Sequence, residues 1–189
     1  MRIITGSLRG RKLVTLEGEG LRPTSDKVKE AIFSIIQFDL PGAEILDLFA
    51  GSGQLGIEAL SRGAEHCVFV DKSKESIGVV KQNVESCKLS DRTRILNCDA
   101  LDHLKMAPKS FDIAFLDPPY RKGLIEAALP LLEPKIKPMG IVVCEHEAGL
   151  DLPESVGRLK LRKKYSYGKL IALTVYDHIV SDNNNNNED

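Results

Sequence analysis

The segment Asp117-Pro118-Pro119-Tyr120 combines an acid, two prolines and an aromatic residue directly after an apolar run. Proline has a fixed φ and no N–H, so the carboxylate of Asp117 and the carbonyl of Pro118 offer two hydrogen-bond acceptors without a donor between them. Two such acceptors can orient the exocyclic amine of a nucleobase for attack on a methyl carbon, while Tyr120 provides a ring on which the base stacks. The base must then be unpaired or flipped out of its helix. The alternative interpretation is a diproline turn beside a core tyrosine.

A glycine-rich segment from Ile45 to Gly56 forms the second candidate site. Its glycines fit the GxGxxG spacing of dinucleotide-binding turns, and Asp71 lies 20 residues after Gly51, where a ribose-binding acid is expected. Asp47 argues against a dinucleotide, because a carboxylate at the strand end, four residues before the first glycine, would face a pyrophosphate of the same charge. The same acid suits the ammonium at the methionine end of S-adenosylmethionine. We therefore expect this methyl donor rather than NAD, with a glycine turn that binds no ligand as the alternative.

Four acids follow four successive apolar runs, at Asp47, Asp71, Asp99 and Asp117. Ligands of doubly wound sheets bind outside the carboxyl ends of the strands, so four acids at one edge indicate a shared site. Asp71 is placed to bind ribose hydroxyls, and Asp99, beside the backbone of Ala100, to accept a hydrogen bond from the adenine amine. Each acid taken alone could instead be a solvated loop residue.

The segments that position these acids alternate between strand and helix patterns. We expect helices at 26–38, 54–62, 73–87, 101–105 and 124–132, and strands from residue 45 to the glycine turn and at 66–70, 93–96, 111–116 and 140–144. Two further alternating stretches, 159–165 and 170–176, have no helix between them and predict an antiparallel hairpin. The expected fold class is α/β: a Rossmann-like, mostly parallel seven-stranded sheet that ends in an antiparallel hairpin, as in class I S-adenosylmethionine-dependent methyltransferases.

Three regions are expected along the chain: a basic N-terminal hairpin extension at 1–24, a methyltransferase domain at 25–180 and a disordered Asn-rich tail at 181–189. Residues 1–12 carry Arg2, Arg9, Arg11 and Lys12 and no acid. This pattern favours either an arm that contacts phosphates or an edge hairpin that is charged only to resist aggregation. Residues 158–169 carry six further basic residues, again without an acid.

Composition places the chain among single soluble domains, with 189 residues, 42% hydrophobic and 28% charged. The formal net charge is −1, so any affinity for nucleic acid must come from the basic clusters. The four cysteines form no CxxC pair and predict reduced, buried thiols, and Cys144 with His146 lacks the further ligands of a metal site. No signal peptide or membrane span is recognisable, and we expect a cytoplasmic protein.

Six motifs occur together: Arg2-Ile3-Ile4-x-Gly6, Arg9-Gly10-Arg11-Lys12-Leu13, Leu21-Arg22-Pro23-Thr24, Asp47-x-Phe49-Ala50-Gly51-Ser52-Gly53, Glu58-Ala59-Leu60-Ser61-Arg62 and Asp117-Pro118-Pro119. In these motifs the chain resembles the bacterial RsmD family. Members of this family are S-adenosylmethionine-dependent enzymes that methylate the exocyclic N2 of a guanine in 16S ribosomal RNA. The likeness extends from the start of the chain to about Tyr176.

The resemblance implies a role for each matching residue. The methyl donor would be held by Asp47, Phe49, Gly51 and Gly53 at its methionine part, by Asp71 at the ribose and by Asp99 at the adenine, with Ala50, Lys72 and Ala100 beside them. The guanine would be held by Asp117, Pro118 and Tyr120, and the RNA would be contacted by Arg9, Arg11, Arg22 and Thr24. The implied partner is 16S rRNA within the small ribosomal subunit or its assembly intermediate, without a membrane or a metal. Many relatives carry phenylalanine at the Tyr120 position, which leaves its hydroxyl without an assigned role.

Two other functions stay open at the level of sequence. The Asp-Pro-Pro-Tyr motif is shared with DNA adenine and cytosine amino-methyltransferases, although so short a chain has no recognisable target-recognition domain. A catalytically silent RNA-binding or assembly factor could keep the same fold. An intact Asp117 and an intact glycine turn argue against that second possibility.

Overall fold

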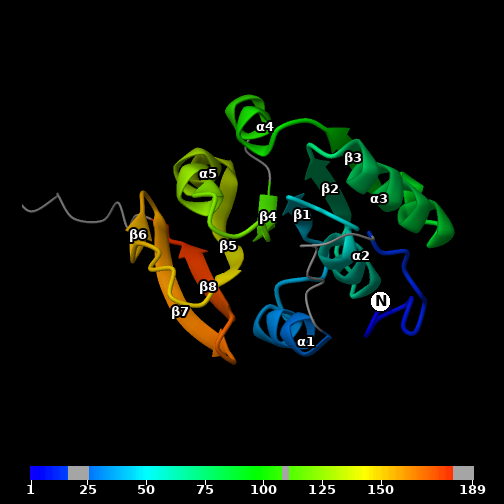
Figure 1. The fold of residues 1–189 in the computed structure, drawn as a ribbon, viewed down its shortest axis with the longest axis horizontal. Helices are drawn as coiled ribbons and strands as arrows, with labels where there is room; N and C mark the ends of the chain where they lie inside the picture. Colours follow the sequence, from blue (N-terminus) through cyan, green and yellow to red (C-terminus); the bar gives the residue numbers. More distant parts are fainter. Residues whose placement is uncertain (17–25, 108–110, 181–189) are drawn as a thin grey trace, which may run out of the picture.

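The computed structural model describes residues 1–16, 26–107 and 111–180, and its core is one eight-stranded sheet with helices on both faces (Figure 1). The strands are β1 (Glu44–Leu48), β2 (His66–Asp71), β3 (Thr93–Asn97), β4 (Phe111–Leu116), β5 (Ile136–Glu147), β6 (Ser155–Val156), β7 (Leu159–Tyr167) and β8 (Ile171–His178). The α-helices are α1 (Asp26–Ile35), α2 (Gln54–Ser61), α3 (Lys74–Ser86), α4 (Ala100–Met106) and α5 (Leu124–Leu132), and short 3₁₀ helices lie at Ser90–Arg92 and Glu133–Lys135.

The strand order is β3-β2-β1-β4-β5-β8-β7-β6, and the first five of these strands are parallel. The chain moves outward from β1 to β3 and then returns to β4 on the other side of β1, which makes β1 and β4 the switch point of the sheet. The antiparallel pairing of β5 with β8 and of β8 with β7 confirms the predicted final hairpin. The sheet has eight strands rather than seven because β6, a two-residue strand too short to leave a periodic pattern, pairs with β7.

Each face of the sheet has its own hydrophobic core. Helices α1, α2 and α3 pack on one face around Phe33, Phe69 and Phe115. Helices α4 and α5 pack on the other around Leu129 and Tyr176. The central strands are therefore covered on both sides, which explains why their sequences are nearly unbroken apolar runs.

Helix α1 ends earlier than its sequence pattern predicts. It stops at Ile35 and is followed by a turn in which the N–H of Asp39 bonds the carbonyl of Ile36. This turn leaves Phe38 89% exposed, whereas the helical pattern had extended to that residue.

Strand β5 begins earlier than predicted. The sequence pattern predicts a strand that begins at Gly140, whereas β5 runs from Ile136 through Pro138 and Met139. They form an irregularity in which the pairing of β4 with β5 shifts register, and Met139 adopts a φ of 64°. Turn-forming residues therefore mark a bulge here rather than a strand end.

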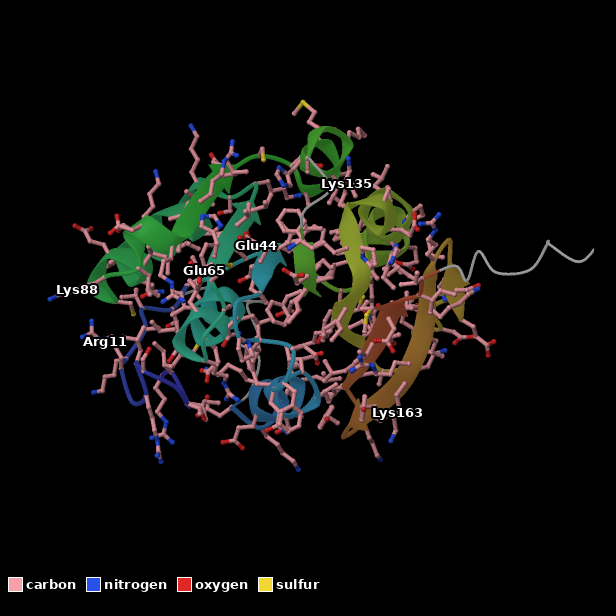
Figure 2. The ribbon with its side chains drawn as sticks, turned by 180° about the vertical axis from the view of Figure 1, so that it is seen from behind. Arg11, Glu44, Glu65, Lys88, Lys135 and Lys163 are labelled. Atoms are coloured by element: carbon pink, nitrogen blue, oxygen red, sulfur yellow. The ribbon has the colours of Figure 1, made fainter. Side chains whose placement is uncertain are left out.

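The N-terminal arm (residues 1–16) folds back on itself as a short, irregular hairpin, as its sequence predicts, with the N–H of Ile3 bonded to the carbonyl of Arg11 and the N–H of Leu13 to that of Met1. An antiparallel bridge joins Arg2 to Lys12, and no regular strand forms within residues 1–16. Arg11 lies at the end of α3, where it donates to the carbonyl of Ser86 (Figure 2). Asn83 of α3 bonds both the N–H and the carbonyl of Val14. The remainder of the expected extension, the boundary at residue 25 and the Asn-rich tail lie outside the described residues.

Two general expectations are tested by the described ranges. None of the helices in them has the length and apolarity needed to cross a membrane. The four cysteines are free thiols, and three are buried. Cys98 is partly exposed, contrary to the expectation, because it follows β3 at the edge of the sheet.

Candidate active site

A cavity of about 590 Å³ lies at the carboxyl edge of β1, β2 and β4. Most of the predicted donor and base residues line it: Asp47, Phe49, Ala50, Gly51, Asp71, Lys72, Asp99, Ala100, Asp117, Pro118 and Tyr120. Gly53 does not; it precedes α2 in a left-handed conformation with a φ of 77° and shapes the glycine turn. The four acids at the strand ends thus face one cavity.

Asp47 is the most buried acid of this cavity, with 2% of its surface exposed. Its Oδ2 accepts a hydrogen bond from the N–H of Gly56 at 2.9 Å, which ties the end of β1 to the first turn of α2. A side chain at Gly56 would come within 2.3 Å of the Phe69 ring, so glycine is required for this approach. Burial raises the pKa of the Asp47 carboxyl to about 7, even though the bond from Gly56 favours the ionised form. A cation bound beside Asp47 would restore its charge.

Asp71 and Asp99 have structural roles in addition to facing the cavity. Asp71 accepts hydrogen bonds from the N–H groups of Gly51 at 2.9 Å and Ser73 at 2.8 Å, and so fixes the glycine turn. Asp99 caps α4, because its Oδ1 accepts from the N–H of Leu101 at 2.9 Å. Each carboxylate oxygen can accept more than one hydrogen bond, so both acids can still serve a ligand.

The Asp117 segment begins where β4 ends, beside the end of β1. Leu116 pairs with Leu48, so Asp117 leaves the sheet next to the first residues of the glycine turn. The hydroxyl of Tyr120 donates to Oε1 of Glu145 at 3.4 Å. This bond gives the hydroxyl a structural role, the fixing of the ring, which the sequence had left unassigned.

Sequence reasoning assigned no individual role to several residues that line the same cavity. They are Met1, Thr15, Leu16, Ser52, Gln54, Leu55, Ser73, Glu75, Ser76, Pro119 and Leu124. Gln54 is notable because its Oε1 is buried and has no hydrogen-bond partner in the described part of the chain. A glutamine at the start of a helix gives no such signal in sequence. Thr15 and Leu16 come from the N-terminal arm, whose packing is a tertiary property.

Two of the predicted RNA-facing residues, Arg9 and Arg11, do not line this cavity. Arg9 and Arg11 are exposed on the N-terminal arm. The end of that arm reaches the cavity through Leu16, so the arm and the cavity are neighbours. Arg22 and Thr24 lie outside the described residues.

The fold and the cavity together define the class. A mostly parallel sheet that ends in an antiparallel hairpin, with a ligand-sized cavity at the β1–β4 switch point, is the Rossmann-like fold of class I S-adenosylmethionine-dependent methyltransferases.

The chain belongs to the RsmD family: the family model described as Conserved hypothetical protein 95 matches residues 1–176. YlbH of Bacillus subtilis is 44% identical over 181 residues, which cover 93% of this chain and 98% of that protein. Ribosomal RNA small subunit methyltransferase D of Haemophilus influenzae is 41% identical over 85% of this chain and 86% of its own length. The solved structure of yhhF from Escherichia coli matches with a TM-score of 0.83 and 32% identity, over 96% of this chain and 99% of that one.

Proposed function

We propose that this protein transfers a methyl group from S-adenosylmethionine to the exocyclic N2 amine of a guanine in the 16S rRNA of the small ribosomal subunit or its assembly intermediate. One observation carries the proposal: Asp47 and Asp117, at the ends of adjacent parallel strands, line the same cavity. A cation at Asp47 and a base at Asp117 would therefore be near neighbours. Relatives named Ribosomal RNA small subunit methyltransferase D support the choice of acceptor.

The residues around the cavity fit the proposed donor. A volume of about 590 Å³ is within the range of small-molecule and cofactor sites. The carboxyl of Asp47 suits the donor's ammonium, Asp71 its ribose hydroxyls and Asp99 its adenine amine. The buried Oε1 of Gln54 is a hydrogen-bond acceptor, and an N–H group of bound S-adenosylmethionine would satisfy it.

The chain's own groups would prepare the acceptor amine. Asp117 and the carbonyl of Pro118 would accept its two hydrogens, which favours a pyramidal nitrogen with an available lone pair. Bound S-adenosylmethionine supplies an electrophilic methyl group, and the electron pair of the broken C–S bond leaves with S-adenosylhomocysteine. The amine becomes acidic only as the new N–C bond forms, so Asp117 or water takes its proton late. Orientation of the amine would provide much of the acceleration.

Transfer of labelled methyl groups tests the proposal. Small subunits from a strain that lacks this activity are incubated with labelled S-adenosylmethionine and the protein, and the rRNA is digested to nucleosides. We expect the label in N2-methylguanosine. Label in duplex DNA alone would indicate a DNA amino-methyltransferase, and RNA binding without any transfer would indicate a silent assembly factor; both results would overturn the proposal.

We expect the affinity for S-adenosylhomocysteine to rise with pH up to about 7 and then level off. Free Asp47 has a pKa of about 7, and the ligand's ammonium favours its ionised form, so below that pH binding must displace a proton. The affinity should fall by about tenfold for each pH unit below 7 until the bound form also protonates. Calorimetry from about pH 5 to about pH 8 measures the slope. Asp47→Asn should bind more weakly and without this slope; an equal slope in that variant would exclude Asp47 as the titrating group.

We further propose that residues 1–24 form an RNA-contacting extension of a catalytic unit at 25–180. Arg9→Ala combined with Arg11→Ala should then weaken RNA binding and reduce the slope of log affinity against log salt by about 1.4, the value for two phosphate contacts on single strands. The matched control is Lys105→Ala with Lys137→Ala, which removes the same charge from residues paired with Asp102 and Asp112. Equal slopes for both double variants would assign the arm's arginines to solubility alone.

A further inference from the structure

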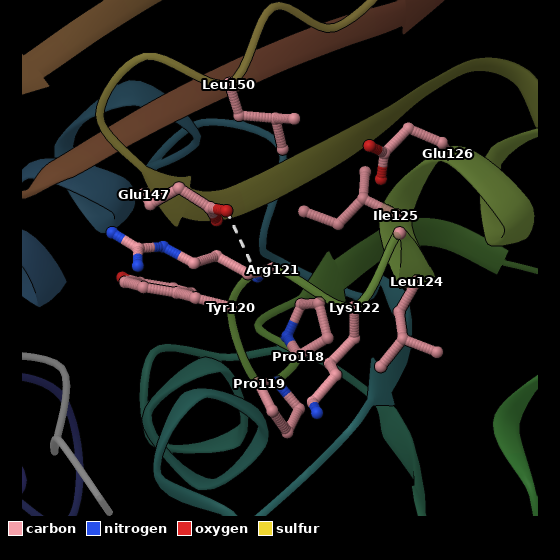
Figure 3. A pocket seen from close by; sticks show the side chains of 11 residues that line it. Pro118, Pro119, Tyr120, Arg121, Lys122, Leu124, Ile125, Glu126, Glu147 and Leu150 are labelled. Atoms are coloured by element: carbon pink, nitrogen blue, oxygen red, sulfur yellow. Dashed lines mark hydrogen bonds between the residues drawn. The ribbon is translucent and has the colours of Figure 1, made fainter.

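A second cavity, of about 240 Å³, adjoins the Asp117 segment. It shares Pro118, Pro119, Tyr120 and Leu124 with the larger cavity and is otherwise lined by the turn into α5, the first residues of α5, the end of β5 and Leu150. Figure 3 shows Ile125 and Leu150 projecting toward the space beside the Pro118 ring, with Glu147 and Glu126 around it. We call it the side pocket. The turn that contains Pro118 and Tyr120 thus borders two cavities.

The turn that forms the wall of the side pocket is held rigidly. Arg121 has a φ of 59°, a left-handed conformation that costs a non-glycine residue of order 1–3 kcal/mol and persists only where the surroundings hold it. Here Oε1 of Glu147, at the end of β5, accepts the N–H of Arg121 at 3.0 Å (Figure 3). The neighbouring Tyr120 is fixed to Glu145 of the same strand. The side pocket is therefore preformed, which lowers the entropy cost of binding.

The walls of the side pocket suit a nucleobase. Leu124 and Leu150 are partly exposed and offer apolar surface against which a planar ring can pack, with the buried Ile125 and Pro118 behind them. The carboxylates of Glu126 and Glu147 are hydrogen-bond acceptors for the N–H edge of a base. The volume is less than half that of the larger cavity, which suits one ring system rather than a whole donor molecule.

The turn also carries exposed cationic side chains, which suit the phosphate backbone of an RNA strand. Arg121 and Lys122 are both exposed and both border the side pocket. Cations in this position neutralise phosphates of an RNA strand. A nucleotide bound there would have its base against Leu150 and its phosphate near these side chains.

We propose that the side pocket binds the base of the nucleotide next to the methylated guanine and so contributes to the choice of target. This inference rests on the proposed function, in which the guanine stacks on Tyr120. Adjacent nucleotides are covalently joined, so the neighbour of a base on Tyr120 lies within one backbone step of that residue. The side pocket is a recess at that distance, because Tyr120 lines it too.

The test combines variants of the pocket with variants of the rRNA. Leu150→Trp fills the pocket, and Glu126→Gln removes one acceptor oxygen. The matched control is Met106→Trp, at an exposed side chain of α4. Each protein is assayed on small subunits with the natural sequence and on subunits in which the nucleotide before or after the guanine is replaced. Binding of S-adenosylhomocysteine and the unfolding temperature confirm that each variant is folded.

We expect Leu150→Trp to raise KM for the subunit about tenfold, the effect of losing one stacked base, without weakening S-adenosylhomocysteine binding. Replacing one of the two neighbouring nucleotides should raise KM for the natural enzyme but add little in Leu150→Trp, since both changes remove the same contact. For Glu126→Gln, the effects of the variant and of the nucleotide replacement on KM should deviate from additivity in the same direction but by less. For Met106→Trp, the two effects should simply add. Fully additive effects, or an unchanged KM in both pocket variants, would overturn the inference. Absence of transfer by the natural protein would instead refute the proposed function.

Discussion

Replacing Asp117 by alanine is expected to lower kcat for methyl transfer by roughly 10²–10⁴-fold, the usual range for a positioned proton acceptor. The variant loses one of the two acceptors that we propose orient the amine, together with a group that would receive its proton. Affinity for S-adenosylhomocysteine should stay nearly unchanged, because the proposed role of Asp117 is to hold the base rather than the donor. Single-turnover kinetics and calorimetry on the same preparation measure the two quantities.

Two variants at the same edge of the sheet serve as controls. Asp117→Asn keeps one acceptor oxygen and should lose less activity than Asp117→Ala. Asp99→Ala should show the opposite pattern, with weaker donor binding, a smaller change in kcat and about 1 kcal/mol of lost helix capping. A fully active Asp117→Ala would contradict its assignment to the amine.

Replacing Glu58 by alanine is expected to destabilise the protein by about 3–5 kcal/mol, the usual cost of breaking a buried ion pair. Both Glu58 and Lys29 have no exposed side-chain surface, and their charged groups are 3.6 Å apart. Burial lowers the pKa of Lys29, and the Glu58 carboxylate opposes that shift. Without Glu58, the ammonium of Lys29 would be buried without its counter-charge, and the N–H groups of Ile4 and Thr5 would lose their acceptor.

Thermal and denaturant unfolding measure this effect. For a domain of this size, 3 kcal/mol corresponds to a fall of at least about 6 °C in the unfolding temperature. Glu58→Gln retains an acceptor and should lie between the natural protein and Glu58→Ala. The control Glu30→Ala, on the exposed side of α1, should change stability by less than about 0.5 kcal/mol. An unfolding temperature for Glu58→Ala equal to that of Glu30→Ala would show that the ion pair contributes nothing.

The elements with clear boundary residues could be predicted from sequence. β4 and α5 begin and end at the predicted residues, because the prolines after Leu116 end the strand and Gly123 precedes the helix. The extent of β5 and the existence of β6 could not be predicted. The boundaries of β5 depend on its pairing with β4, and those of β6 on its pairing with β7. The local sequence pattern does not reveal which distant segments pair.

The candidate site divides in the same way. The acids at the strand ends could be predicted to share a cavity, because parallel strands end at one edge. The burial of Glu58 could not be predicted, since a glutamate in an amphipathic helix usually faces solvent and here the N-terminal arm covers it. The side pocket could not be predicted either, because Glu147 and Leu150 are far from Arg121 in sequence and come next to it only in the folded protein.

A crystal structure with bound S-adenosylhomocysteine tests the central claim most directly, namely that one cavity brings a methyl donor to the Asp117 segment. We expect the ligand in the cavity of about 590 Å³, with its ammonium about 3 Å from the Asp47 carboxylate and its sulfur facing Asp117 and Pro118. Ligand density at another site, or a ligand whose sulfur faces away from Asp117, would contradict the claim.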